Sequence, residues 1–318
     1  MHFDLNDLRL FVLAADEGSL TKAAAKHHLS LAAASARIKA LEAQTDLPLL
    51  YREARGVRLS PPGQAFLHHA RLMLHQAELL RSDLHEYGGG LRGRLRIYAN
   101  TTAVTDFLPE ILPRFLSDNP KINIDLQEKP NAEIAKAVLD GRGDIGIVSA
   151  PMNVLGLQST YFSTDRLVLA TSRKHRLAKR KRISFAEILD EDAVGMHPDS
   201  TLQTFLSQVT ERLGKPQKLR IQLASFDAMC RMIGAGVGVG IVPESAAKRN
   251  QISMNLALIE LTEPWSVRER YILTRDQAIL PSYAQALIAQ LCAHYASNDA
   301  PHAAPHKSGA QTRGVIKA

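Results

Sequence analysis

The sequence predicts an α+β multi-domain protein, in which a long coiled-coil linker helix joins an N-terminal all-α winged helix-turn-helix to two α/β lobes. Three patterns support this. Residues 18–44 have the pattern of two short amphipathic helices around a tight turn. A heptad repeat of apolar residues follows in residues 66–87. From residue 91 onward, strand-like and helix-like segments alternate, which is typical of sheets covered by helices.

Residues 1–60 have the pattern of a winged helix-turn-helix domain. An amphipathic helix over residues 4–17 ends at Gly18, and Ser19 and Ser30 are each placed to cap a following helix. The buried face of the second of these helices recurs at i, i+4 and i+7, at Ala34, Ile38 and Leu41. Alanine-rich faces let two helices pack closely, as a helix-turn-helix requires. We therefore expect the second helix to enter the major groove of DNA, as in that motif.

The segment from Tyr51 to Leu59 predicts a two-stranded wing with Gly56 at its tip. Residues 18–60 carry seven Lys or Arg against three Asp or Glu, a balance that favours contact with phosphates but also occurs on ordinary solvated surfaces. The candidate contacts to double-stranded DNA are hydroxyl and basic side chains of the two helices and the wing: Thr21, Lys22, Ser30, Ser35, Arg37, Lys39, Arg52 and Arg55.

Residues 61–90 predict a linker helix followed by a hinge. Ser60-Pro61 is a good helix opening, and Gly88–Gly90 breaks the helix. The apolar seam alternates in steps of four and three through Phe66, Ala70, Met73, Ala77, Leu80, Leu84 and Tyr87. We expect this seam to pair two copies of the chain through residues 62–87; the alternative is that the helix packs on its own domain.

Residues 91–296 predict two α/β lobes with parallel sheets, lobe I over about 91–162 and 266–296 and lobe II over about 163–265. Strands are expected over or near 95–99, 122–126, 144–148, 166–171, 192–196, 218–224, 238–242, 256–261 and 270–274. Helices are expected over or near 107–116, 134–139, 184–189, 200–213, 226–235 and 282–294. Residues 297–318 lack apolar periodicity and predict a disordered tail.

Composition and motifs narrow the class of protein. No apolar run approaches membrane-spanning length, no signal peptide stands out, and Cys230 and Cys292 form no framework, so we expect a cytoplasmic protein without membrane contact. The glycines of residues 88–93 match a dinucleotide fingerprint but follow a helix and open a strand, so no cofactor is expected. No zinc spacing and no catalytic elbow appear, so neither a metal nor an enzyme is expected.

This order of elements, with the text LRLFVLAADEGSLTKAAAKHHLS, SARIKALE, LLYREARGVRLSPPG, LDGRGDIGIV and SFDAMCRMIGAGVGVGIVP, resembles the LysR-type transcriptional regulators over about residues 4–296. The resemblance implies a DNA-binding activator or repressor controlled by a small-molecule effector. It also implies a homotetramer built as a dimer of dimers, with RNA polymerase as a further partner. Its C-terminal part is implied to have a two-lobed periplasmic-binding-protein-like fold. Members often carry Gln-Pro where this chain has Leu31-Ala32, and a basic residue where it has Ala36.

The effector is expected in the cleft between the lobes. Thr101 and Thr102 follow the first strand, where α/β folds gather ligands, and helix starts favour anions, so we expect a small anionic metabolite. By resemblance, Ser149, His197, Ser225 and Phe226 line the cleft walls. The alternative is that Thr101, Thr102 and Ser225 only cap helices. For the whole chain, the alternatives are an α/β enzyme with a DNA-binding appendage and a constitutive architectural DNA-binding protein.

Overall fold

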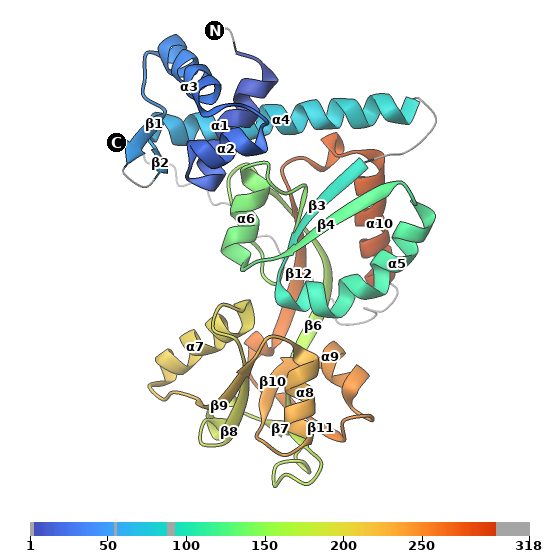
Figure 1. The fold of residues 1–318 in the computed structure, drawn as a ribbon. Coiled ribbons are helices and arrows are strands. Elements are labelled where there is room, and N and C mark those ends of the chain that lie inside the picture. The colour runs from blue at the N-terminus through green and yellow to red at the C-terminus, as the bar shows by residue number, and fades with distance from the viewer. Residues whose placement is uncertain (1–2, 54–55, 88–92, 297–318) are drawn as a thin grey trace, which may run out of the picture.

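The computed structural model describes residues 3–53, 56–87 and 93–296. The winged helix-turn-helix, a long helix and two lobes follow one another through the molecule (Figure 1). This confirms the predicted fold class. Arg55, the predicted break at Gly88–Gly90 and the predicted tail over 297–318 lie outside the described residues.

The N-terminal domain contains α1 (Leu5–Glu17), α2 (Leu20–Lys26), α3 (Leu31–Thr45) and the wing strands β1 (Leu50–Glu53) and β2 (Gly56–Leu59). The predicted buried face of α3 is confirmed, because Ala34, Ile38 and Leu41 pack in the domain core. The Oγ atoms of Ser19 and Ser30 accept backbone N–H bonds at the starts of α2 and α3, as predicted. These caps and the core fix the angle between the two helices.

The wing is seated on the turn between α1 and α2. The backbone N–H of Val57 donates to the carbonyl oxygen of Gly18 over 2.9 Å. Gly56 has φ +131°, and a Cβ there would lie 2.1 Å from the same oxygen. Glycine is therefore required at residue 56 for the wing to approach so closely.

The linker helix is α4 (Pro61–Tyr87). The two parts of its predicted apolar seam have different surroundings. The ring of Phe66 packs edge-to-face on Phe11, with centroids 4.9 Å apart, and Ala70 is buried. The first part of the seam therefore packs within its own chain, so the prediction that the whole seam pairs two copies is wrong there. Met73, Leu80 and Leu84 are exposed by 46%, 58% and 62%.

Lobe I contains the 7-residue strands β3 (Gly93–Ala99) and β4 (Ile122–Glu128), the short β5 (Ile145–Val148), and the helices α5 (Leu108–Asp118), α6 (Asn131–Leu139) and α10 (Ser282–Ala296). A π-helical turn (Ala103–Phe107) precedes α5, and a 3-10 turn (Gln277–Ile279) precedes α10. β3 runs parallel to β4 and β5, so the carboxyl ends of β3 and β5 meet at the side that faces lobe II. The face of α4 opposite to Met73 lies on this lobe, where His75 and Leu79 are buried.

Lobe II contains the strands β7 (Arg182–Ile183), β8 (Asp192–Met196), β9 (Lys218–Leu223), β10 (Gly240–Pro243) and β11 (Leu256–Leu261). Its helices are α7 (Thr201–Leu213), α8 (Phe226–Gly234) and α9 (Glu244–Asn250), with 3-10 turns at Phe185–Ile188 and Pro264–Ser266. A separate hydrophobic core fills this lobe, built from apolar residues between Leu167 and Leu261.

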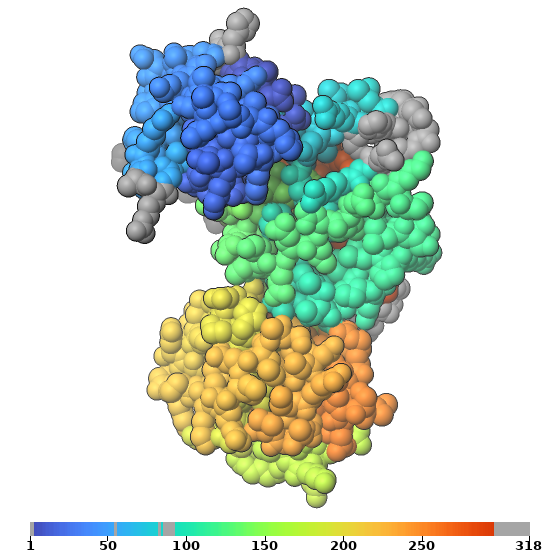
Figure 2. Space-filling model, viewed as in Figure 1, coloured from blue at the N-terminus to red at the C-terminus, as the bar shows by residue number. Residues whose placement is uncertain are grey.

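Two long strands, β6 (Gln158–Ser172) and β12 (Val267–Thr274), join the lobes, which meet at a waist (Figure 2). β6 pairs antiparallel with β12, and further along with β10 and β11. The expectation of parallel sheets is therefore wrong for this part, because strands that cross between lobes and return must pair antiparallel. Only the β3–β4, β3–β5, β7–β11 and β8–β9 ladders among the described strands are parallel.

Candidate functional site

The exposed surface of α3 is the first candidate site. Leu31, Ala32, Ala36 and Lys39 are exposed along this helix, and Ser30 is exposed at its start. Thr21 and Lys22 are exposed in the first turn of α2. Apolar side chains can contact the methyl group of thymine but cannot hydrogen-bond to a base edge. The surface therefore has few groups that read bases directly.

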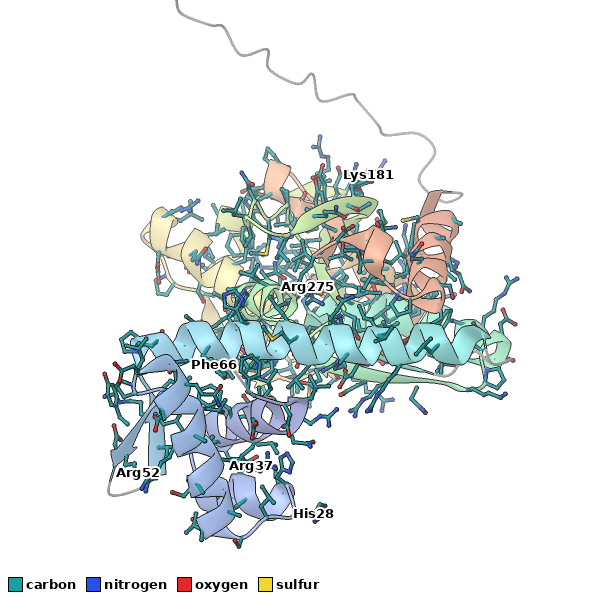
Figure 3. The ribbon with its side chains drawn as sticks, turned by 90° about the horizontal axis from the view of Figure 1, so that it is seen from above. His28, Arg37, Arg52, Phe66, Lys181 and Arg275 are labelled. Carbon is teal, nitrogen blue, oxygen red and sulfur yellow. The ribbon has the colours of Figure 1, made fainter. Side chains whose placement is uncertain are left out.

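The wing contributes to the same surface. Arg52 lies on β1 of the wing, as labelled in Figure 3. Its Nη2 donates to Oγ of Ser35 on α3 over 2.8 Å. The structure thus brings two predicted DNA contacts together from different elements. The bond leaves the other guanidinium nitrogens of Arg52 available to a ligand, because the side chain is exposed.

Arg37 differs from the other predicted contacts. Its Nη1 lies 2.6 Å from Oδ1 of Asp7 and 3.6 Å from Oδ2 of Asp4. Hydrogen bonding to Asp7 raises the pKa of Arg37. The guanidinium is therefore held against the start of α1, and its predicted contact with DNA stays a prediction that would require it to leave these carboxylates. Two positions along a helix are about 200° apart, so Arg37 and Lys39 point to opposite sides.

The second candidate site is a cavity of about 30 Å³ between the lobes, lined by Thr101, Thr102 and Ser149 as predicted. Its other lining residues come from both lobes and from the crossing strands: Asn100, Phe107, Ile147, Val148, Asp165, Arg166, Leu167, Thr201, Leu202, Pro243, Arg268 and Arg270. One water molecule needs roughly 10–15 Å³ of such a cavity, so this conformation has room for only a few.

Thr101 and Thr102 do not cap the helix that follows them, so that alternative is wrong. The backbone N–H of Ala103 donates instead to Oδ1 of Asn100 over 3.0 Å. Oγ1 of Thr101 donates to Oε1 of Glu128 over 2.6 Å. Nε2 of His197, from lobe II, lies 3.9 Å from the same carboxylate oxygen. His197 therefore lies opposite lobe I beside Thr101, although it does not line the cavity itself.

The remaining two predicted effector contacts are placed elsewhere. Phe226 is 2% exposed and packs in the core of lobe II, so its assignment to the cleft wall is wrong. Oγ of Ser225 accepts from the N–H of Ala228 and caps α8, which is the alternative reading of this residue. The ring of Phe226, at the first position of α8, is buried because this end of the helix packs against the hydrophobic core of lobe II.

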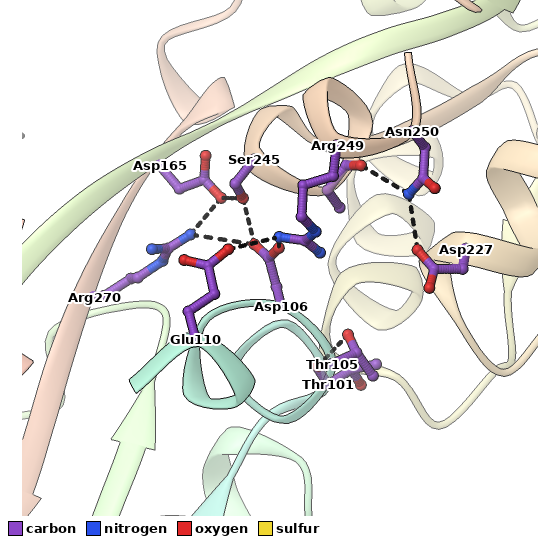
Figure 4. A network of polar contacts seen from close by, with 11 residues as sticks. Thr101, Thr105, Asp106, Glu110, Asp165, Asp227, Ser245, Arg249, Asn250 and Arg270 are labelled. Carbon is purple, nitrogen blue, oxygen red and sulfur yellow. Dashed lines mark hydrogen bonds and ion pairs between the residues drawn. The ribbon is translucent and has the colours of Figure 1, made fainter. Parts of the chain in front are cut away.

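A network of charges connects the lobes next to the cavity (Figure 4). Asp106, which is 2% exposed, comes from lobe I and pairs with Arg249 of α9 in lobe II. Oγ of Ser245 on α9 bonds to Asp106 and, over 2.7 Å, to Asp165 on β6. Arg270 on β12 pairs with Asp165 and lies 3.8 Å from Asp106. These contacts hold the two lobes together.

Arg268, two residues before Arg270 on the same face of β12, has different surroundings. Its Nη2 lies 3.3 Å from Oγ of Ser149, and its guanidinium stacks 4.6 Å from the ring centroid of Phe205 on α7. Among the described residues, no carboxylate lies within 4.0 Å of it. Burial lowers the pKa of Arg268. Of the three arginines that line the cleft, Arg166 and Arg270 have carboxylate partners, and Arg268 has none among the described residues.

Sequence reasoning missed Arg268, Arg270 and Phe205. The predicted strand began at residue 270, although Arg268, Arg270 and Ile272 alternate and so share one face of a longer strand. The signal in the sequence was that two arginines alternate with an apolar residue on one face of a strand, which places their charges toward the interior. Nothing in the spacing of α7 distinguishes Phe205 from an ordinary core residue.

The fold and these two sites define a class of protein: a winged helix-turn-helix reader of DNA carried by a two-lobed ligand-binding domain. Family models match both parts. The LysR substrate binding domain matches residues 88–296, and the bacterial regulatory helix-turn-helix protein of the lysR family matches residues 5–64. The chain belongs to the LysR family of transcriptional regulators. It is a DNA-binding transcriptional regulator with an effector-binding domain.

Curated relatives span nearly the whole chain. A probable RuBisCO transcriptional regulator of Trieres chinensis is 29% identical over 255 residues, which cover 78% of this chain and 82% of the relative. The HTH-type transcriptional regulator CysL of Bacillus subtilis (strain 168) is 24% identical over 261 residues, which cover 82% and 87%. Such identities support the family and leave the effector open.

Solved structures share the fold. Full-length OxyR C199D from Pseudomonas aeruginosa is 21% identical, with a TM-score of 0.69 over 92% of this chain and 94% of that one. CbnR, a LysR family transcriptional regulator, is 20% identical, with a TM-score of 0.62 over 92% and 99%. A structure of full-length CbnR with its target DNA aligns with a TM-score of 0.59 at 20% identity, over 93% and 99%.

Over residues 3–53, 56–87 and 93–296, none of the helices combines the length and apolar character needed to cross a membrane. In the same ranges, no group of three or more His, Cys, Asp or Glu side chains is arranged to hold a metal ion.

Proposed function

We propose that this regulator binds a small anionic metabolite between lobe I and lobe II, and that the metabolite changes its affinity for a specific double-stranded DNA operator. The observation that carries the proposal is that the guanidinium of Arg268 has no carboxylate partner among the described residues. A half-buried guanidinium normally has a carboxylate partner, because an uncompensated charge is costly to desolvate. In the cleft, a ligand carboxylate or phosphate group would take that place.

The neighbouring arginine provides an internal comparison. Arg270 shares the strand and the face, and Asp165 and Asp106 neutralise it. Asp165 is opposite Arg268 in the strand register, yet its carboxylate is occupied by Arg270 and Ser245. Arg268 is thus left with the hydroxyl of Ser149 and the ring of Phe205. A flat oxyanion, paired with this guanidinium and bordered by Thr102 and Ser149, fits that chemistry.

Binding requires the lobes to separate. The present cavity of about 30 Å³ is too small for a metabolite. In the described part of the chain, β6 and β12 are the strands that cross between the lobes, and the contacts of Asp106 with Arg249 and Ser245 close the cleft. Hinge motion about β6 and β12 would open it and change the position of lobe II, which is a common route from ligand to conformation.

A thermal-shift screen of the full-length protein tests the class of effector. The panel pairs each small carboxylic or phosphorylated acid with its neutral amide or alcohol and with an amine of similar shape. We expect stabilisation by one or more acids and by none of their neutral or cationic counterparts. Stabilisation by neutral or cationic compounds alone would contradict the proposal.

For the DNA surface, we propose contacts from Thr21, Lys22, Ser30, Ser35, Lys39 and Arg52, and from Arg55 in the wing. Thr21, Lys22, Ser30, Lys39 and Arg52 are supported by their exposure, and Ser35 by its bond with Arg52. Arg55 is outside the described residues and is proposed from the sequence alone. Phosphate contacts then supply much of the affinity, and spacing and DNA shape supply much of the specificity. A constitutive architectural protein is excluded if an acid from the screen changes DNA affinity.

We also propose that the exposed stripe of Met73, Leu80 and Leu84 on α4 pairs two copies of the chain, and that dimers assemble into a tetramer. Apolar residues at this spacing and exposure are costly in water. Light scattering of Leu80→Glu/Leu84→Glu should show a smaller assembly than the wild type or than Gln64→Glu, an exposed position on the opposite side of the same helix. Acting on chromosomal DNA, the assembly would work in the cytoplasm, with RNA polymerase as a further partner.

A further inference from the structure

We infer a second ligand site, for a small multivalent oxyanion, in the cavity where the winged helix-turn-helix, α4 and lobe I meet. The cavity measures about 610 Å³. Its walls come from α1, α2 and the following turn, from α4, and from β3, β4 and the turn after α6. It is separate from the cleft between the lobes, because the two share no lining residue.

The lining carries more positive than negative charge. It includes six Arg or Lys and three Asp or Glu. Each of the three carboxylates is paired with a lining arginine: Asp16 with Arg71, Glu78 with Arg96, and Asp125 with Arg94. Two opposite walls therefore keep cations beyond these pairs, namely Arg9 and Lys26 on the DNA-binding domain and Arg142 on lobe I.

Two of these further cations, Arg9 and Arg142, are weakly neutralised. Among the described residues, Arg9 meets only Oδ1 of Asn6, over 3.4 Å. Arg142 lies 3.5 Å from Asp140, a carboxylate that it shares with His68 at 3.5 Å and Arg71 at 3.9 Å. Lys26 pairs with Glu17, outside the lining. A cavity with cations on facing walls favours an anion between them.

A buried side chain without a hydrogen bond lines this cavity and also the adjacent one that contains Asp144. His75 on α4 is 6% exposed, lines the cavity, and neither ring nitrogen makes a hydrogen bond within the described residues. Nδ1 lies 3.4 Å from Oδ1 of Asp144, which itself lacks a hydrogen bond. Nε of Arg71 and Nε of Arg142 are buried without acceptors as well. Unpaired buried donors are rare in proteins, and a bound acceptor accounts for them.

The ligand chemistry follows from these groups. Donors and cations call for oxygen acceptors, and two facing walls call for at least two anionic groups, of phosphate or carboxylate type. Such a ligand would contact Arg9 and Arg142 at once. It would then fix the DNA-binding domain relative to lobe I, which gives the site a means to control DNA binding independently of the cleft.

Calorimetric titration of the full-length chain tests the site, with inorganic pyrophosphate and citrate as probes at constant ionic strength. All variants are made in the Arg268→Met background to reduce binding in the cleft. Any probe still bound in the cleft would be affected equally in all variants, because none of the further substituted residues lines it. We expect pyrophosphate, citrate or both to bind, and Arg9→Gln and Arg142→Gln each to weaken binding about tenfold. The control is Arg114→Gln, an exposed arginine of α5 whose partner is Asp118.

The identity of the binding probe distinguishes a phosphate site from a carboxylate site, and either result supports the inference. His75→Gln provides a further variant within the lining and should weaken binding as well. Absence of binding by both probes would overturn the inference. Equal affinities in the Arg9→Gln, Arg142→Gln and Arg114→Gln variants would also overturn it, because binding would then be non-specific.

Discussion

The surface of the winged helix-turn-helix and the cleft between the lobes both present cations, but they are built differently. On the first, Lys39 is exposed without a partner among the described residues, and Arg52 makes one bond to Ser35. In the cleft, Arg270 is 5% exposed within a network of buried carboxylates. Exposed charges act almost independently and are screened by salt, whereas a buried network acts as a unit. Single substitutions should therefore have unlike consequences in the two regions.

Asp106→Ala should have the largest effect. It removes the carboxylate shared by Arg249, Arg270 and Ser245, although Arg270 keeps Asp165 and Arg249 keeps Glu110. We therefore expect a loss of about 1.5–3 kcal/mol in effector-domain stability. Urea unfolding followed by the fluorescence of Trp265, which packs on Phe185 and Phe205 in lobe II, measures it.

The matched control for this substitution is Glu110→Ala. Glu110 lies 3.4 Å from the same arginine, Arg249, but is half-exposed, so we expect a loss of less than about 1 kcal/mol. If the two variants were equally stable, the network would not act as a buried unit, and the contrast between the regions would be lost.

The buried imidazole of His75 should make stability depend on pH. Burial lowers its pKa from 6.5 to about 3, so between these values the unfolded chain binds a proton that the folded chain does not. The contribution of His75 to the free energy of unfolding is complete above pH 6.5. As the pH falls below this value, that free energy decreases by up to about 1.4 kcal/mol per pH unit. The burial of Asp144 raises the pKa of that carboxyl and acts in the opposite direction.

Comparison of the wild type with His75→Leu isolates this contribution, since Asp144 is present in both. The difference between the urea midpoints at pH 7.5 and pH 5 should be smaller in His75→Leu than in the wild type. In the control His69→Gln, which changes an exposed neighbour, the difference should equal that of the wild type. Parallel pH dependence in all three chains would show that His75 is not desolvated.

Arg52→Ala should weaken DNA binding by about tenfold and lower the slope of log K against log salt by about 1, because one phosphate contact is lost. The DNA is an operator that the wild type selects from a random pool. Lys248→Ala removes a cation of lobe II that pairs with Glu244 and should leave both values unchanged. A reduced affinity with an unchanged salt slope would show that Arg52 does not contact phosphate.

Arg37→Ala should have the smallest effect on DNA binding. Its charge is already engaged by Asp7 and Asp4, so we expect affinity within about twofold of the wild type and a small loss of thermal stability. A loss as large as that of Arg52→Ala would mean that Arg37 leaves Asp7 to contact the operator.

Sequence patterns were enough to predict the helices of the DNA-binding domain and part of the cleft. The spacing of Ala34, Ile38 and Leu41 predicted the buried face of α3, and two serines predicted the starts of α2 and α3. Local signals suffice there because periodicity and capping depend on neighbours in the chain. The cleft residues Thr101, Thr102 and Ser149 were found because ligands gather at the ends of strands.

The remaining residues depend on contacts between distant segments. A heptad seam does not specify its partner, so Phe66 packs on Phe11 of its own chain. The first half of β6 is polar because it crosses between lobes, and only its apolar second half was predicted. Whether Arg268 or Arg270 receives Asp165 depends on the packing of α9 against β6 and cannot be inferred from alternation along β12.

The most direct test is the affinity of the cleft for the best acid from the screen, measured by calorimetry with the wild type, Arg268→Lys and Arg268→Met. Loss of a buried charge partner costs about 2–5 kcal/mol. We therefore predict that Arg268→Met binds about 30-fold or more weakly than the wild type, and that Arg268→Lys restores part of the affinity. Equal affinities in all three chains would contradict the account.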